Sequence, residues 1–347
     1  MNMRCFKPLS RMRRVLFGIA LVVSVAGVAL SADDDEYTAD VRRRFKPDKP
    51  AACMDYSVTY RLLGLELKHL ATARVTAEEG FWPGWDGVTR PACLVDFVLS
   101  TGGADAESQR GMVQIYNRIT AVLTMPDLNA VLFIKRSKQR INLLCKRKYL
   151  DNLEIYNTET GALDYVCHDY LSNTVSTNLV GAEDLTRQGR EGSRFLKVLH
   201  ANYHNNLAQD DQSQNAFDPE APVYIYTEGD LVPFRLDFGE ERDIVPALGT
   251  EIPAMYFAAR PHREAGGRGR NFDMWAASFL DVSLKSEQPD LVSLARTSLP
   301  WSMVPLRTDL GLPLGAIRCY LTGIRALPLP GGATPGLQAG ASLPGGV

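Results

Sequence analysis

The chain has 347 residues, of which 45% are hydrophobic and 22% charged, a balance that allows one large or two small hydrophobic cores. The formal net charge is −2 and no strongly basic face is evident, so nucleic-acid binding is not expected.

The first 32 residues have the layout of a secretory signal peptide. Five basic residues come before an apolar run at residues 15–30, and small residues and an acidic run follow it. The apolar run is shorter than the roughly 20 residues that a spanning helix needs. We therefore expect cleavage after residue 32 and a periplasmic location, the alternative being an uncleaved anchor in the inner membrane. Cleavage would leave 33 basic against 40 acidic residues, a net charge of −7, and no membrane span.

Residues 33–52 are charged and contain Pro47 and Pro50, which predicts a flexible lead-in. Beyond it, alternating apolar and polar residues predict short strands separated by turn residues. Residues 80–91 are expected to form an aromatic loop, and residues 111–119 a short helix or strand. Strands are expected at residues 55–63, 66–76, 92–99, 118–125, 130–135, 154–156, 162–166 and 175–179.

The second half of the chain contains the best helix candidate, residues 187–206. A hairpin is predicted at residues 222–237 and a short surface helix at residues 288–297. The Pro- and Gly-rich residues 327–347 are expected to be a disordered tail. Further strands are expected at residues 252–259, 272–284, 303–306 and 316–324.

This order of elements predicts a mainly β protein, with a single domain at residues 53–326. Hairpins dominate and no βαβ alternation is present, so a parallel α/β fold is not expected. The simplest architecture is a strongly curved antiparallel sheet, or open barrel, with the helix packed on it.

The residues that could carry chemistry do not form a convincing catalytic or metal site. His200 and His204 would share one face of the predicted helix, but Ala201 replaces the glutamate of the HExxH motif and no third ligand is evident. No metal, cofactor or catalytic residue is therefore expected. Five cysteines follow the expected signal peptide, and their spacing is not that of a metal site. The sequence is compatible with disulfides and with buried free thiols at these positions: Cys53, Cys93, Cys145, Cys167 and Cys319.

Three strands are apolar on both faces, at residues 92–99, 130–134 and 272–284. Either both faces are covered, or one apolar face lines a cavity. The candidate lining residues are Trp275, Phe279, Phe97 and Phe133. The aromatic loop either forms a binding rim or folds back into the core, and its candidate rim residues are Phe81, Trp82 and Trp85.

The chain resembles a bacterial periplasmic family, domain-of-unknown-function family 3108, over roughly residues 55–325. The resemblance rests on the segments YSVTYRLLGLELKHLATARV, IYNRITAVLTMPDLNAVLFIKRS, VYIYTEGDLVPFRL and VPLRTDLGLPLGAIRCYLTGI. Residues 285–301 look like an insertion relative to that family. The sheet layout implied by the resemblance is similar to that of periplasmic lipoprotein carriers, which hold acyl chains under a helical lid.

The leading hypothesis is a non-enzymatic, monomeric envelope protein that binds an apolar ligand, such as a lipid, or an envelope partner within the curved sheet. An exported metal-dependent hydrolase using His200 and His204 is the first alternative. A structural scaffold of the cell envelope is the second.

Overall fold

The structure is a computed structural model that describes residues 36–62, 65–84, 86–101, 113–125, 129–143, 146–157, 162–178, 223–227, 230–262, 270–297, 303–312 and 315–329. Its helices are α2 (Glu36–Arg44), α4 (Phe279–Lys285) and α5 (Pro289–Thr297). Its strands are β1 (Lys46–Pro47), β2 (Ala51–Leu62), β3 (Leu65–Pro83), β4 (Thr89–Ser100), β5 (Val113–Thr124), β6 (Asn129–Leu143), β7 (Lys146–Asn157), β8 (Ala162–Asp169), β9 (Thr174–Asn178), β10 (Val223–Thr227), β11 (Asp230–Ala247), β12 (Thr250–Pro261), β13 (Phe272–Ser278), β14 (Met303–Leu312) and β15 (Gly315–Leu327).

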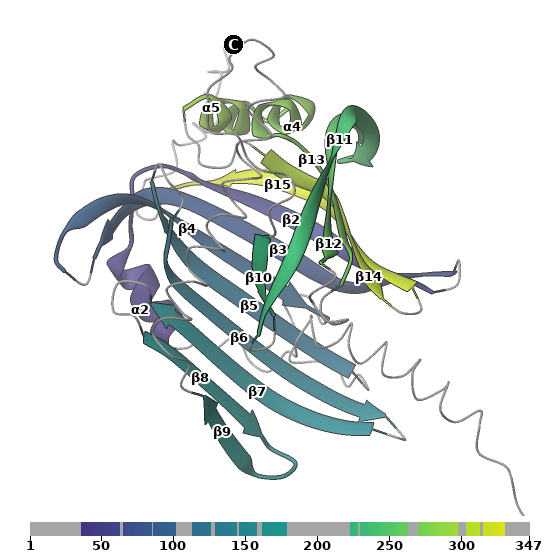
Figure 1. The fold of residues 1–347 in the computed structure, drawn as a ribbon. Coiled ribbons are helices and arrows are strands. Elements are labelled where there is room, and N and C mark those ends of the chain that lie inside the picture. Colours follow the sequence, from purple (N-terminus) through teal and green to yellow (C-terminus); the bar gives the residue numbers. More distant parts are fainter. Residues whose placement is uncertain are drawn as a thin grey trace, which may run out of the picture.

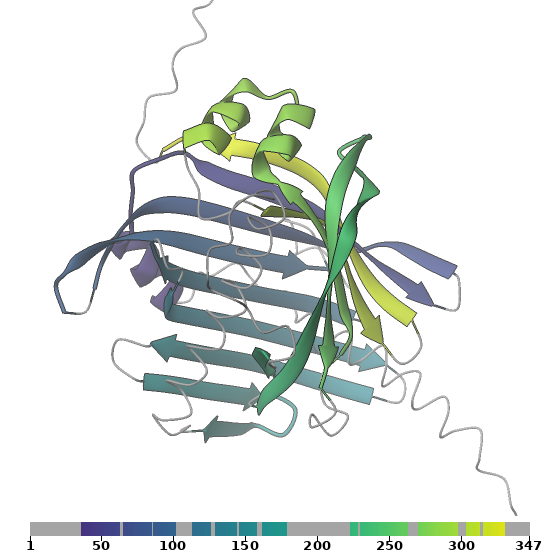
Figure 2. The ribbon, with the colours of Figure 1, turned by 45° about the horizontal axis from the view of Figure 1, so that its top comes forward.

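All these strands belong to one antiparallel sheet, so the predicted mainly β class is confirmed. The strand order is β10-β11-β12-β13-β14-β15-β2-β3-β4-β5-β6-β7-β8-β9, and β1 pairs with β3. Most neighbours are consecutive in the chain, whereas β15 pairs with β2 and brings the two ends of the described chain together. In both views β11 runs steeply across the direction of β3 to β7, which shows how strongly the sheet curves (Figures 1 and 2).

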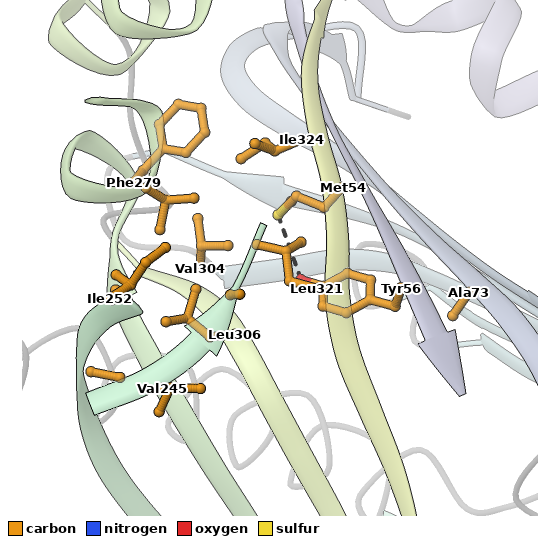
Figure 3. Close-up of a cluster of buried hydrophobic side chains, with 14 of the residues drawn as sticks. Met54, Tyr56, Ala73, Val245, Ile252, Phe279, Val304, Leu306, Leu321 and Ile324 are labelled. Carbon is orange, nitrogen blue, oxygen red and sulfur yellow. Dashed lines mark hydrogen bonds between the residues drawn. The ribbon is translucent and has the colours of Figure 1, made fainter. Parts of the chain in front are cut away.

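The main hydrophobic core lies inside this curve. Figure 3 shows Met54 and Tyr56 of β2 and Leu321 of β15 on one side of it, and Ile252 of β12 on the other. Phe279 of α4 extends the cluster at one end. We call the side of β2 to β9 that faces this cluster the inner face.

The opposite side of β3 to β7 is covered by α2, and we call it the α2 face. Val41 and Phe45 are buried there against Trp82, Leu94 and Ile134. The expectation of a flexible lead-in is therefore wrong for residues 36–52, which form α2, β1 and the start of β2. Phe45 directly follows α2, and its backbone N–H donates a hydrogen bond to the Val41 carbonyl at 2.9 Å, so the two side chains lie on the same side.

Gly80 permits the close approach of β1 to β3. A Cβ at this position would lie 2.1 Å from the carbonyl oxygen of Lys46 and 2.7 Å from the Cα of Pro47. The predicted aromatic loop at residues 80–91 is wrong for most of its length, because β3 continues to Pro83 and β4 begins at Thr89.

The predicted strand at residues 272–284 is correct only as far as Ser278. The Ser278 side chain accepts a hydrogen bond from the backbone N–H of Asp281, which caps the first turn of α4. Phe279, Val282 and Ser283 then point to the interior at helical spacing. The run is apolar on both sides because it combines a strand and a helix. The surface helix expected at residues 288–297 is confirmed as α5.

In the described residues Cys53, Cys93, Cys167 and Cys319 are present as thiols and form no disulfide. None of the helices described is both long and apolar enough to cross a membrane. Several expectations lie outside the described residues: the signal peptide at residues 1–32, the helix at residues 187–206, and the tail from residue 330 onward. His200, His204, Trp85 and Cys145 lie outside them as well.

Candidate functional site

The inner face of β4, β5 and β6 carries a continuous group of apolar side chains. In the register of the sheet, Val95 lies opposite Ala121, Ala121 opposite Phe133, and Phe97 opposite Ile119. Directly opposed residues of antiparallel strands face the same side, as do residues two apart on one strand. These five residues therefore form one apolar stripe on the inner face, and two of them, Phe97 and Phe133, were candidate lining residues.

Burial separates the two faces of these strands. On the α2 face Leu94, Val122, Leu132 and Ile134 are buried, and they pack in the cluster beneath α2. All five residues of the apolar stripe, in contrast, are only partly buried. Apolar surface therefore remains open on the inner face, where the described strands have no packed layer equivalent to α2.

Phe97 marks the border between the apolar stripe and the main core, because it packs against that core while staying partly exposed. Phe279 lies within the core itself and is 2% exposed. Its position in α4 makes it part of the packing that holds the helix on the sheet.

Trp275 has a more polar environment than the sequence predicts. Its indole Nε1 donates a hydrogen bond to Asp243 Oδ2 at 2.7 Å. The guanidinium of Arg307 lies 4.3 Å from its ring centroid, and the Tyr256 ring lies 5.0 Å away. Trp275 is partly buried at the border of the main core, and its ring is held by a hydrogen bond, a cation and an aromatic neighbour.

Arginine–aspartate pairs continue this cluster over the neighbouring strands. Arg307 donates to Asp309 Oδ1 at 3.0 Å, and Arg318 donates to Asp309 Oδ2 at 3.1 Å. Arg260 pairs with Asp273, which also accepts a hydrogen bond from the Tyr256 hydroxyl at 2.6 Å. Each of these carboxylates is neutralised by an arginine, so the cluster around Trp275 stabilises the sheet by paired charges.

The candidate rim residues have different environments. Trp82 is 0% exposed and belongs to the cluster under α2, with Arg44 5.1 Å from its ring centroid. The expectation of an exposed rim is therefore wrong for Trp82, and the alternative of folding back into the core holds for it. Phe81, on the opposite side of β3, is 40% exposed.

Polar residues follow the apolar stripe along the inner face. Asn117 lies opposite Leu99 of the main core and opposite Ser137, which in turn lies opposite Asn152. Gln139 is two residues beyond Ser137, so it shares the inner face. The sequence analysis did not identify this polar group, because polar residues in a strand usually indicate a solvated face. Its available signal was the alternation of Ser137 and Gln139 with charged residues.

A second polar group, on the α2 face, consists of Glu78, Asp96, Arg118 and Arg42. Asp96 accepts hydrogen bonds from Arg118 at 2.9 Å, from Arg42 at 2.9 Å and from the Thr120 hydroxyl at 2.8 Å. Burial opposes ionisation of Asp96, but the hydrogen bonds and charges of Arg118 and Arg42 outweigh it and lower the pKa. Burial raises the pKa of Glu78, whose ion-pair partner among the described residues is Arg42 at 3.6 Å.

The other described side chains that could bind a metal are dispersed: no group of three or more His, Cys, Asp or Glu that could hold an ion occurs among the described residues. Burial raises the pKa of the Cys319 thiol to about 11, so this cysteine stays protonated and unreactive.

Comparisons with known proteins concern the fold only. No family model matches this chain, and no curated protein matches it. A solved structure described as a β-barrel-like protein of domain of unknown function DUF1849, from Brucella abortus, is similar at 11% identity over 81% of this chain and 99% of that one, with a TM-score of 0.37. A DUF1329 family protein from Desulfovibrio piger is similar at 10% identity over 80% of this chain and 86% of that one, with a TM-score of 0.19. The resemblance to family 3108 stays a prediction.

Proposed function

We propose that this protein binds an apolar ligand, the acyl chain of a lipid, on the inner face of its curved sheet. The observation that carries the proposal is the apolar stripe: five neighbouring apolar residues from three strands are partly exposed on one face, while the other face of the same strands is buried under α2. Contiguous exposed apolar surface on a concave face is the usual feature of a site for an apolar molecule.

The energetics suit a transient carrier. Each buried methylene contributes about 0.8 kcal/mol, so ten methylenes contribute roughly 8 kcal/mol before costs. Loss of translational and rotational freedom offsets about half of this or more. The net of about 4 kcal/mol corresponds to a Kd of about 1 mM for ten methylenes, and each further buried methylene tightens it.

The proposal includes export and a role without catalysis. The basic and apolar pattern of residues 1–32 supports a periplasmic location for the mature chain. Binding is favoured over catalysis because the buried carboxylate Asp96 is held ionised by arginines, and because the apolar stripe itself contains no nucleophile. The mature chain would act as a monomer, with the ligand as its partner.

Lipid titration with a charge inserted in the stripe tests the proposal. Palmitate carrying bromine on its chain quenches tryptophan fluorescence on contact, and Phe133→Trp places a reporter in the stripe. We expect saturable quenching of this reporter and a lipid adduct in native mass spectrometry. Phe133→Asp should weaken binding at least tenfold.

Val175→Asp is the matched control, because Val175 is an apolar residue of β9 that is 61% exposed and lies outside the apolar stripe. It should bind the lipid like the unchanged protein. If none of several lipid classes quenched the fluorescence of the Phe133→Trp reporter, the proposal would be refuted. A structural scaffold of the cell envelope would then be the favoured hypothesis. Equal weakening by both aspartates would also refute a site at the stripe.

A further inference from the structure

Gln139 Oε1 and Asn152 Oδ1 are buried amide oxygens of neighbouring strands on the inner face, and neither accepts a hydrogen bond from the residues that the structure describes. Gln139 as a whole is only 3% exposed. A buried carbonyl oxygen without a donor is unfavourable, so native proteins supply one from the chain, from water or from a ligand. The sequence gives no reason for two such groups in neighbouring strands of a sheet.

The two oxygens belong to one place in the sheet. Ser137 lies opposite Asn152, and Gln139 lies opposite Leu150. Gln139 and Asn152 are therefore diagonal neighbours on the same face, with Cβ atoms about 7 Å apart. Two donors on a small polar group could reach both oxygens.

This place lies on the same strand as the apolar stripe, one inner-face residue beyond it. Phe133, Ser137 and Gln139 share the inner face of β6 with Lys135, which stands between Phe133 and Ser137 and opposite Ile119, and β6 has no register shift between them. At about 3.4 Å per residue, Gln139 lies about 20 Å from Phe133 along the strand. The inner face is thus apolar at one end and has two unpartnered acceptors at the other.

We propose that the ligand is an amphipathic lipid whose polar end is neutral and donates hydrogen bonds, such as a hydroxyl-bearing glycerol ester, and that Gln139 and Asn152 accept those hydrogen bonds. This inference rests on the proposed function, since it names the class of lipid for the same face. The acyl chain covers the apolar stripe, and the hydroxyl groups satisfy the two oxygens.

The chemistry of the two atoms selects against an anionic end. A carboxylate has no hydrogen to donate, so it would leave both carbonyl oxygens unpartnered and place its own charge beside them. The cost of such an unsatisfied group corresponds to about tenfold in affinity. We therefore expect a lipid with free hydroxyls to bind about tenfold more tightly than a fatty acid with the same chain.

The test compares three ligands of one chain length on the unchanged protein: monopalmitoylglycerol, its dimethyl ether, and palmitate. The hydroxyl lipid should bind about tenfold more tightly than the other two. The dimethyl ether keeps the shape and lacks the donors, so equal binding of the ether and the parent lipid would overturn the inference. This comparison needs no variant and is independent of folding.

Variants then locate the acceptors. Gln139→Met and Asn152→Leu remove an amide while keeping a similar volume, and each should reduce the tenfold preference severalfold while leaving palmitate binding unchanged. Asn271→Leu changes an exposed amide before β13 and should keep the full preference. A preference retained in both inner-face variants is the result expected if a buried water satisfies the oxygens, and it would overturn the inference.

The two proposals fail in different ways. Equal binding of all three ligands overturns only the choice of lipid class and leaves acyl-chain binding standing. Absence of binding by all three overturns the proposed function, and the further inference with it.

Discussion

Asp96 connects three elements on the α2 face through its side-chain oxygens. Arg118 and Thr120 of β5 and Arg42 of α2 all donate to it. Glu78, on the neighbouring strand, has no comparable set of donors in the described structure, and its pKa is raised by burial while that of Asp96 is lowered. In their ionised forms, Asp96 should therefore stabilise the fold and Glu78 should destabilise it.

Removing each charge should separate these effects. Asp96→Asn removes the carboxylate charge that pairs with Arg118 and Arg42, and it should lower the free energy of unfolding by about 3 kcal/mol at pH 7. Glu78→Gln removes a buried charge with a weak partner, so stability at pH 7 should stay equal or rise. Chemical denaturation of the two variants and the unchanged protein measures this. A larger loss for Glu78→Gln than for Asp96→Asn would contradict our account.

The pH dependence of these differences follows from the two pKa shifts. The pKa of Asp96 is below its ordinary value of 3.8, so its contribution is fully present above pH 3.8 and is lost as the pH falls through the folded-state pKa. The pKa of Glu78 is above its ordinary value of 4.5, so its cost is absent below pH 4.5 and complete above the folded-state pKa. Denaturation curves recorded across this acid range should show the Asp96→Asn deficit shrinking toward low pH and the Glu78→Gln gain growing as the pH rises from 4.5. Variants with a constant difference at every pH would contradict the assignment.

At the scale of elements, α2 is the cover that makes the two faces of β4 to β6 different. Val41 and Phe45 pack on the cluster around Trp82, and β1 continues the contact where Gly80 lets it approach. Since this layer buries one face, the other face of the same strands is left to form the apolar stripe. The helix therefore determines which face of these strands can form the proposed site, although it lies on the other face.

Shortening Phe45 should loosen this layer. Phe45→Ala removes a ring that is only 3% exposed and should cost about 3–5 kcal/mol of stability. It should also shift tryptophan emission to longer wavelengths, because Trp82 gains access to water. Tyr37→Ala changes a side chain of the same helix that is 50% exposed, and it should have little effect on either measurement. An equal loss in both variants would show that α2 is not held by this contact.

At the scale of the whole molecule, the pairing of β15 with β2 joins the C-terminal strands to the N-terminal half of the sheet. Ile317, Leu321 and Ile324 of β15 are in the main core, and the register runs from Gly315↔Leu62 to Leu327↔Ala51. Pairing two strands so distant in sequence requires closing a long loop, which costs conformational entropy before the contacts form. We therefore expect slow folding.

Two truncations test the importance of this closure. A chain that ends after residue 312 lacks β15 and should not give a cooperative thermal transition, because β2 and β14 each lose one of their two neighbouring strands. A chain that ends after residue 329 keeps β15 and should retain the melting temperature of the whole chain, as expected from its Pro- and Gly-rich tail. Thermal unfolding by circular dichroism measures both. Cooperative unfolding without β15 would mean that the two parts of the sheet fold separately.

The sequence determined most of the strands by itself, because the period of two and the turn residues act locally. Tyr56 and Val58 already show which side of β2 is apolar, and the residues between Tyr226 and Leu231 mark a hairpin that the structure confirms. Phe97 and Phe133 could be selected as candidates from the apolar character of their strands. Their common face could be derived only once the register of β4 to β6 was known.

Only the tertiary structure decided what covers each face. Period-two alternation states which residues share a side, but it does not state whether a helix, another strand or nothing packs there. The run at residues 272–284 shows the limit, since the cap at Ser278 turns it from strand to helix and buries Phe279. Trp82 became a core residue through contacts with α2, a segment far from it in the chain, whereas Gln139 and Asn152 became neighbours through the register of the consecutive strands β6 and β7. Which element covers a face, and in which register two strands pair, depend on contacts that the alternation of residues along one strand does not encode.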